Sequence, residues 1–181
     1  MTSKTPPEAT AGATAPPDAE AAFQALLAAL APRFAPGLKP PVLVGIHTGG
    51  AWVAERLHEA LCPQAPLGLL SSAFHRDDFS RRGLRAGMQR GSTRIDFEIE
   101  GADILLVDDV LYTGRTLRAA LNELFDYGRP RRVDLAVLVD RGGRELPVHA
   151  EIAGCRLVLD PALSLVLGRE ADRFVFTLEG A

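Results

Sequence analysis

Residues 102–116 constrain this chain more than any other stretch of it. The apolar run Ile104–Val107 is typical of a buried strand in a parallel sheet. We expect this strand to end on two adjacent carboxylates, Asp108 and Asp109, and a helical pattern to begin after Thr116. Ligands of open α/β sheets bind just outside the carboxyl ends of the strands. The stretch therefore predicts an α/β fold with a binding site at the end of this strand.

The turn between the acid pair and the helix has the chemistry of an anion site. A helix start offers unpaired N–H groups and the positive end of the helix dipole. Gly114 allows close approach of the backbone, and Thr113 and Thr116 add hydroxyl donors. The carboxylates of Asp108 and Asp109 instead suit a sugar diol or Mg²⁺. A ligand with both a phosphate and a diol is a ribose 5-phosphate, although an acid pair alone is also ordinary turn and N-cap chemistry.

A second strand, glycine turn and helix start lie nearer the N-terminus. The expected strand Val42–Ile46 leads into His47-Thr48-Gly49-Gly50, and a helix is predicted over Ala51–Leu61. The same physics makes this turn a second candidate anion site. A Thr-Gly-Gly turn is equally common as a purely structural element. We interpret it as an anion site because the chain also contains the first motif.

The remaining elements complete a doubly wound parallel sheet with a small C-terminal hood. Residues 1–17 are predicted to be a disordered leader, and residues 18–181 one domain. Further elements are expected as a helix over 19–34 capped by Asp18, a helix ending near Tyr127 before Gly128, strands over 67–74, 93–99 and 133–139, and short hood strands over 156–159, 164–167 and 173–178.

Residues 75–94 have no hydrophobic period and are rich in arginine. Such a run is often a solvated loop. A loop of this length inside a compact domain is more often functional. We therefore predict a mobile lid that closes over an anionic ligand and excludes water. Its arginines are Arg76, Arg81, Arg82, Arg85, Arg90 and Arg94.

Composition gives no support for a nucleic-acid-binding, disulfide-rich or membrane protein. The 181 residues carry a net charge of −3, which gives no general argument for nucleic acid. Cys62 and Cys155 are far apart, so we expect structural thiols in a reducing compartment, the cytoplasm. The apolar run Ala21–Ala31 is too short to cross a bilayer, and no membrane association is expected.

The segment Leu106–Thr116 resembles the PRPP-binding motif of type I phosphoribosyltransferases (PRPP is 5-phosphoribosyl 1-diphosphate). Together with Arg76-Asp77-Asp78, Tyr127-Gly128-Arg129-Pro130 and Leu138-Val139-Asp140-Arg141-Gly142, it makes the chain similar to the PyrR family from about residue 19 onward. Members are uracil phosphoribosyltransferases, and some also regulate pyrimidine genes by binding mRNA. The resemblance implies the type I fold with a hood, a homodimer or higher oligomer, and Mg²⁺-dependent conversion of PRPP and uracil into UMP and pyrophosphate, a nucleotide-salvage reaction.

The resemblance also implies roles for particular residues. Asp108 and Asp109 would hold the ribose hydroxyls and Mg²⁺, the latter directly or through PRPP, and Arg76 would join them in catalysis from the lid, with help from Arg81 or Arg82. Asp140 is either a general base or a turn residue. The implied PRPP and nucleotide contacts also include Thr48, Gly49, Gly50, Val110, Leu111, Tyr112, Thr113, Gly114, Arg115, Thr116, Arg141 and Leu165.

Three departures from the family pattern bear on function. The diphosphate loop commonly carries Thr-Arg-Gly, and here Gly49 replaces the arginine. RNA-binding members usually have a histidine where this chain has Gly143, and basic residues where it has His149 and Cys155. Because RNA binding depends on clustered Lys and Arg, these changes argue against mRNA binding. Two alternatives to a uracil enzyme stay open: an RNA-binding regulator that senses UMP or PRPP, and a phosphoribosyltransferase for another base.

Overall fold

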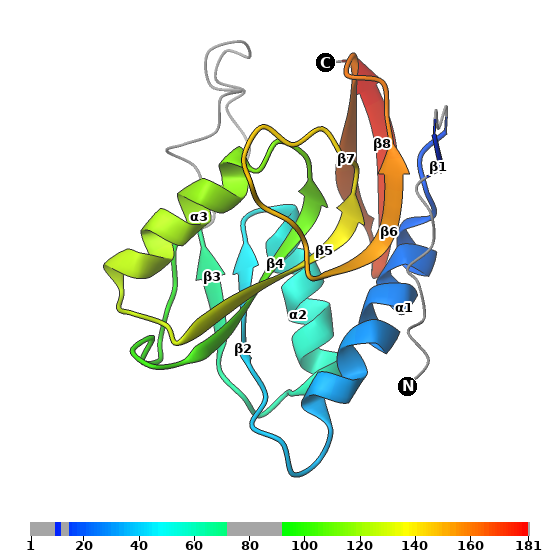
Figure 1. The fold of residues 1–181 in the computed structure, drawn as a ribbon. Coiled ribbons are helices and arrows are strands. Elements are labelled where there is room, and N and C mark those ends of the chain that lie inside the picture. The colour runs from blue at the N-terminus through cyan, green and yellow to red at the C-terminus, as the bar shows by residue number, and fades with distance from the viewer. Residues whose placement is uncertain (1–9, 12–14, 72–91, 181) are drawn as a thin grey trace, which may run out of the picture.

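The computed structural model describes residues 10–11, 15–71 and 92–180, in which a parallel sheet lies between two layers of helices (Figure 1). The six strands of this sheet are in the order β1-β6-β5-β4-β2-β3. A separate antiparallel hairpin, β7–β8, forms the hood. The bounds are β1 Thr10–Ala11, β2 Val42–Ile46, β3 Leu67–Leu70, β4 Asp103–Leu111, β5 Arg132–Asp140, β6 Ile152–Val158, β7 Leu163–Glu170 and β8 Arg173–Gly180.

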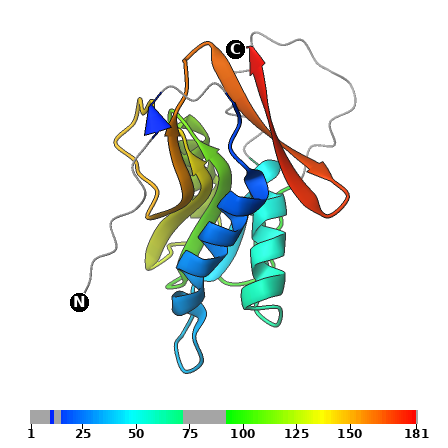
Figure 2. The same ribbon diagram turned by 90° about the vertical axis from the view of Figure 1, so that its right-hand side faces the viewer.

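Helices cover both faces of the sheet, so the predicted doubly wound arrangement is confirmed. Helices α1 (Ala19–Leu30) and α2 (Gly49–Leu61) lie on one face, and α3 (Arg115–Asp126) lies on the other (Figures 1 and 2). Side chains alternate between the two faces of β4, so Leu105 joins the core under α1 and α2, and Leu106 joins the core under α3. The continuous apolar strands seen in the sequence are therefore buried on both sides.

The predicted cap of α1 is confirmed. Oδ1 of Asp18 accepts hydrogen bonds from the backbone N–H groups of Glu20 (2.9 Å) and Ala21 (3.1 Å). The helix is shorter than predicted, because α-helical geometry ends at Leu30 and a 3₁₀ turn, η1, covers Ala31–Phe34. Pro32 has no N–H group to donate to the preceding turn, and this accounts for the change. By contrast, α2 begins two residues earlier than predicted, at Gly49.

Two strand predictions need correction. Strand β4 does not stop at Asp108 and Asp109 but continues to Leu111, because the backbone ladder with β5 runs on to Asp140 whatever the side chains are. The predicted strand over 93–99 is reduced to one bridge between Arg94 and Leu69. The apolar side chains Ile95, Phe97 and Ile99 still pack in or beside the core under α3. The alternating pattern therefore reflects burial of one face and not pairing in the sheet.

The hood is smaller than predicted. Residues 156–159 do not belong to it: Arg156 to Val158 lie in β6, which pairs with β5 in the central sheet, and Leu159 is buried in the core. The hood is the β7–β8 hairpin alone, which stands beside the sheet next to α1 (Figure 2).

A polar and aromatic contact fixes the hood to both helices on its side. The guanidinium of Arg56 in α2 lies 4.1 Å from the ring centroid of Phe23 in α1 and 4.4 Å from that of Phe174 in β8. It also donates two hydrogen bonds to Glu20, of 2.7 and 3.1 Å, and Oε1 of Glu20 accepts the N–H of Phe174. The bond from Arg56 is the main cause of a lowered pKa for Glu20. The hood is thus held in a defined position.

Several predictions fall wholly or partly outside the described residues. Within the predicted leader, Thr10–Ala11 pairs with β6, and the leader's order is otherwise untested. Of the predicted lid, residues 75–91, with Arg76, Arg81 and Arg82, lie outside the described part of the chain. Among the helices that the structure describes, none is both long and apolar enough to cross a membrane.

Candidate functional site

The two acidic residues lie where the sequence predicts a site, at the carboxyl end of β4. Asp108 is only 3% exposed, and its Oδ1 accepts the backbone N–H of Asp109 at 3.0 Å. Asp109 is half-buried. The starts of α2 and α3 both lie at this end of the sheet, so two helix N-termini point their free N–H groups toward the same region.

The Thr48-Gly49-Gly50 turn lies directly against the acid pair. A Cβ added at Gly49 would overlap the Asp109 carboxylate, with 2.5 Å to Cγ. A Cβ added at Gly50 would lie 2.5 Å from the carbonyl oxygen of Val107 and 2.7 Å from Cα of Asp108. The structure thus brings together two motifs that are far apart in the sequence, and both glycines are needed for their contact.

His47 precedes this turn and is joined to Thr48 by a cis peptide bond. Burial is the main cause that lowers its pKa below the ordinary 6.5, against an opposing effect of Glu55. The imidazole is therefore mainly neutral at pH 7. The positive potential at this end of α2 comes from the backbone and not from His47.

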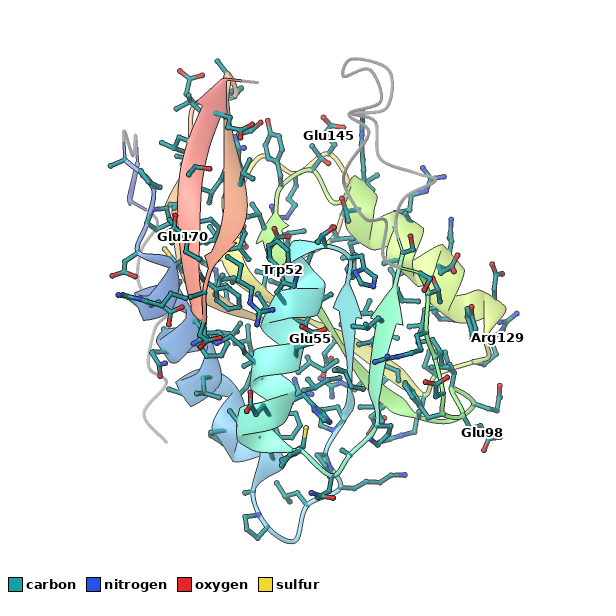
Figure 3. All side chains as sticks on the ribbon, turned by 180° about the vertical axis from the view of Figure 1, so that it is seen from behind. Trp52, Glu55, Glu98, Arg129, Glu145 and Glu170 are labelled. Carbon is teal, nitrogen blue, oxygen red and sulfur yellow. The ribbon has the colours of Figure 1, made fainter. Side chains whose placement is uncertain are left out.

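The turn after β4 has the geometry predicted for close approach to an anion. Gly114 has φ +93° and directly precedes α3. A Cβ there would lie 2.5 Å from Cγ2 of Val148, so glycine is required for both conformation and space. Oγ1 of Thr113 accepts the N–H of Arg115 at 3.3 Å. Glu145, near the start of α3 in Figure 3, pairs with Arg115 at 2.7 Å.

Tyr112 and Arg141 connect this turn to the hood. The guanidinium of Arg141 lies 3.8 Å from the ring centroid of Tyr112. Nη1 donates to the carbonyl of Leu163 at 2.9 Å, and Nη2 donates to that of Asp160 at 3.4 Å. Arg141 is 4% exposed, its burial lowers its pKa, and its Nε has no hydrogen-bond partner among the described residues. This cation therefore stays in the interior between the turn and the hood.

The predicted site residues fall into three groups. Thr48–Gly50 and Asp108–Thr116 lie together at the carboxyl end of the sheet, with Arg141 beside Tyr112. Leu165 lies in the hood, and its side chain packs into the core under α1 and α2. Arg76 lies outside the described residues.

Sequence reasoning overlooked Arg144, whose only signal was its place in a charged turn after a buried strand. Its Nη2 donates to Oδ1 of Asp140 at 2.5 Å, and the N–H of Gly142 donates to the same oxygen at 3.1 Å. Nε of Arg156 lies 3.9 Å from the other oxygen. These contacts favour the turn role for Asp140 over the general-base role.

The acid pair has the carboxylate chemistry that magnesium ions favour. In the part of the chain that the structure describes, no group of three or more His, Cys, Asp or Glu side chains is placed to hold a metal ion. Two neighbouring carboxylates fit Mg²⁺, which commonly takes one or two protein carboxylates and completes its shell with water and substrate phosphates.

Known structures share this fold. The chain matches a hypoxanthine phosphoribosyltransferase of Trypanosoma cruzi with a TM-score of 0.55 and 20% identity, covering 84% of this chain and 85% of the other. It matches a purine phosphoribosyltransferase of Pyrococcus horikoshii with a TM-score of 0.53 and 21% identity, covering 77% and 86%. At these identities the likeness shows the fold alone.

The sequence profile described as "Phosphoribosyl transferase domain" matches residues 18–160, and together with the fold it defines the chain as a type I phosphoribosyltransferase. A protein of Ralstonia nicotianae named "Bifunctional protein PyrR" is 50% identical over 170 residues, covering 90% of this chain and 94% of its own. One of the same name from Nitrosococcus oceani is 54% identical over 123 residues, covering 67% and 68%. The chain belongs to the PyrR family.

Proposed function

We propose that this protein transfers the 5-phosphoribosyl group of PRPP to uracil and so produces UMP and pyrophosphate. The observation that carries the proposal is the contact of the Asp108–Asp109 pair with the start of α2, at the same end of the sheet as the start of α3. PRPP has a diol between a phosphate and a diphosphate, and this end of the sheet offers a matching order of acceptors and donors. The relatives named "Bifunctional protein PyrR" support uracil as the base.

Each part of PRPP has a proposed position. The ribose hydroxyls donate to Asp108 and Asp109, and the 5-phosphate binds the N–H and hydroxyl groups of residues 113–116. The diphosphate lies at the start of α2, against Thr48, Gly49 and Gly50. Arg76 joins it in the proposal, although this residue is outside the described chain.

The proposed chemistry follows from where charge develops. The bond between C1 and the diphosphate oxygen breaks, with the electron pair staying on pyrophosphate, and a bond from C1 to uracil N1 forms. The N1 proton passes to the released pyrophosphate or to water. Positive charge develops on the ribose ring near Asp108 and Asp109, while negative charge leaves toward the start of α2. Mg²⁺ held by the acid pair and by substrate oxygens would neutralise charge on the diphosphate.

The base is proposed to lie between the end of β5 and the hood, near Arg141 and Leu165. The Arg141 contacts with Tyr112, Leu163 and Asp160 hold the hood at a set distance from the ribose site. Uracil presents a hydrogen-bonding edge with acceptor, donor and acceptor groups, which backbone groups of a rigid hood can recognise.

A panel of bases tests this proposal. Uracil, hypoxanthine, guanine, adenine and orotate are each incubated with PRPP and Mg²⁺, and nucleotide products are quantified. We expect UMP as the main product and no product after EDTA treatment, with activity restored by added Mg²⁺. A purine nucleotide as the main product would show that the substrate is a purine base and not uracil. If no base gives a product, the proposed enzymatic function is overturned.

An RNA-binding regulator is the alternative compatible with the relatives' names, and the described surface supports it less well. Gly143 and His149 are exposed and carry no fixed positive charge, and Cys155 is half-buried. Arg144 uses its guanidinium inside the protein. Counterion release needs clustered exposed cations, and these positions do not provide them.

The proposal includes a cytoplasmic location and a homodimer or higher homo-oligomer. Both Cys62 and Cys155 are free, and burial raises the pKa of each thiol, which fits unreactive structural cysteines in a reducing compartment. The oligomeric state rests on the family resemblance.

A further inference from the structure

Residues 140–148 are here called the outer clamp. They donate hydrogen bonds to the backbone carbonyl groups of the turn after β4. The N–H of Arg141 donates to the carbonyl of Leu111 at 3.1 Å. The N–H groups of Glu145 and Leu146 both donate to the carbonyl of Thr113, at 3.0 and 3.2 Å. Backbone N–H groups of the outer clamp thus hold the carbonyls of Leu111 and Thr113.

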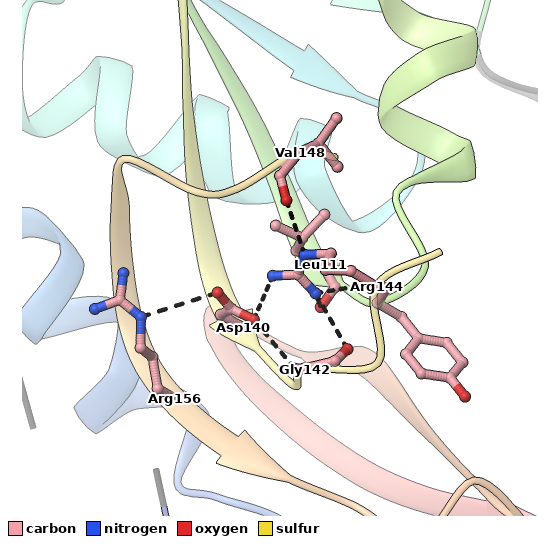
Figure 4. Close-up of polar contacts among 7 residues, drawn as sticks. Leu111, Asp140, Gly142, Arg144, Val148 and Arg156 are labelled. Carbon is pink, nitrogen blue, oxygen red and sulfur yellow. Dashed lines mark hydrogen bonds and ion pairs between the residues drawn. The ribbon is translucent and has the colours of Figure 1, made fainter. Parts of the chain in front are cut away.

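The side chain of Arg144 completes this clamp (Figure 4). Its Nη1 donates to the carbonyls of Tyr112 at 2.7 Å, Leu111 at 3.2 Å and Gly142 at 3.1 Å. Its Nε donates to the carbonyl of Val148 at 3.3 Å, and its Nη2 pairs with Asp140. The side chain is 21% exposed, so most of these bonds are shielded from water.

The direction of these carbonyls determines where the neighbouring N–H groups point. In a trans peptide the C=O of one residue and the N–H of the next point in opposite directions. The carbonyls of Leu111, Tyr112 and Thr113 point toward the outer clamp. The N–H groups of Tyr112, Thr113 and Gly114 therefore point away from it, toward the side on which a phosphate can bind.

We propose that Arg144 is a positioning residue for the phosphate turn. It does not touch the substrate but holds two of the three carbonyls whose orientation aims the N–H donors. This inference rests on the proposed function, because it assumes that the turn binds the 5-phosphate. The planar guanidinium, with donors fixed on several edges, is suited to bind four carbonyls and a carboxylate together. A lysine ammonium has one donor centre and cannot reproduce this pattern.

The test compares Arg144→Met with Arg156→Met as a matched control. Arg156 also faces Asp140, but it lies in β6 and makes no contact with the turn among the described residues. We expect the KM for PRPP to rise about 10- to 100-fold in Arg144→Met with kcat changed by less than about threefold, because misaimed donors weaken binding of the phosphate. Arg144→Lys should recover little of the loss, and Arg156→Met should resemble the wild type.

Several outcomes separate this inference from others. A lower melting temperature in Arg144→Met with unchanged KM would reduce Arg144 to a structural role and overturn the inference. If Arg144→Met does not fold, Asp140→Asn replaces it and should raise KM by a smaller factor. A fall in kcat alone in Asp140→Asn would instead indicate the general-base role. If wild-type protein binds neither PRPP nor UMP in a calorimetric titration, the proposed function itself fails.

Discussion

Replacing Asp108 and Asp109 together by asparagine is expected to lower UMP formation from PRPP and uracil by at least about 10³-fold. Asparagine has nearly the same shape, so the buried position of Asp108 and its bond to the N–H of Asp109 remain available. What disappears is the paired negative charge near C1 of the ribose and the carboxylate donors for Mg²⁺. Initial rates measured with saturating uracil and varied PRPP give the result.

The control for this double substitution is Asp103→Asn. Asp103 lies at the opposite end of β4 and pairs with Arg131, far along the strand from the proposed site. We expect the rate of Asp103→Asn to stay within a few-fold of the wild type. Unchanged turnover in the Asp108→Asn/Asp109→Asn protein would refute the assignment of these carboxylates.

The second large effect is expected from Gly49→Ala. The new methyl group would occupy the space of the Asp109 carboxylate, because a Cβ at Gly49 would lie 2.5 Å from Cγ of Asp109 and 2.9 Å from its Cβ. The atoms in conflict belong to a side chain and not to the backbone, so the fold can adapt by turning Asp109 away. Displacing one catalytic group in this way should lower kcat/KM by about 10²-fold.

Gly168→Ala is the matched control, because the nearest atom to a Cβ there is the carbonyl oxygen of Val175 at an ordinary 3.5 Å. Its kcat/KM and melting temperature should both be close to those of the wild type. A Gly49→Ala protein with wild-type kcat/KM would mean that the position of Asp109 does not matter for turnover. That result would separate the Thr48–Gly50 turn from the proposed site.

The central strands of the sheet were predictable from the sequence, and so were the hood strands β7 and β8, but the place of β6 in the central sheet was not. Ile104–Val107 and Leu135–Val139 are continuous apolar runs, and both lie in central strands. Strand β6 is harder to detect because it contains Arg156 and Gly154. A Cβ at Gly154 would overlap the carbonyl of Ala22, so glycine there allows α1 to pack closely, a reason invisible without the fold.

Some residues of the candidate site were predictable from the sequence, and others were not. Asp108, Gly114 and Thr48–Gly50 belong to short local motifs whose chemistry is readable in order along the chain. Arg144 acts on residues more than thirty positions earlier, and its partners are backbone carbonyls, which every residue has. No residue pattern records such contacts, so only the folded structure could identify the outer clamp.

A crystal structure of the protein with bound UMP tests the central claim most directly. The account predicts that the 2′ and 3′ hydroxyls of the ribose lie within hydrogen-bond distance of Asp108 and Asp109, and that the phosphate contacts the N–H groups of residues 113–116 at the start of α3. The account would be contradicted by a phosphate bound elsewhere, or by a ribose whose hydroxyls make no contact with either carboxylate.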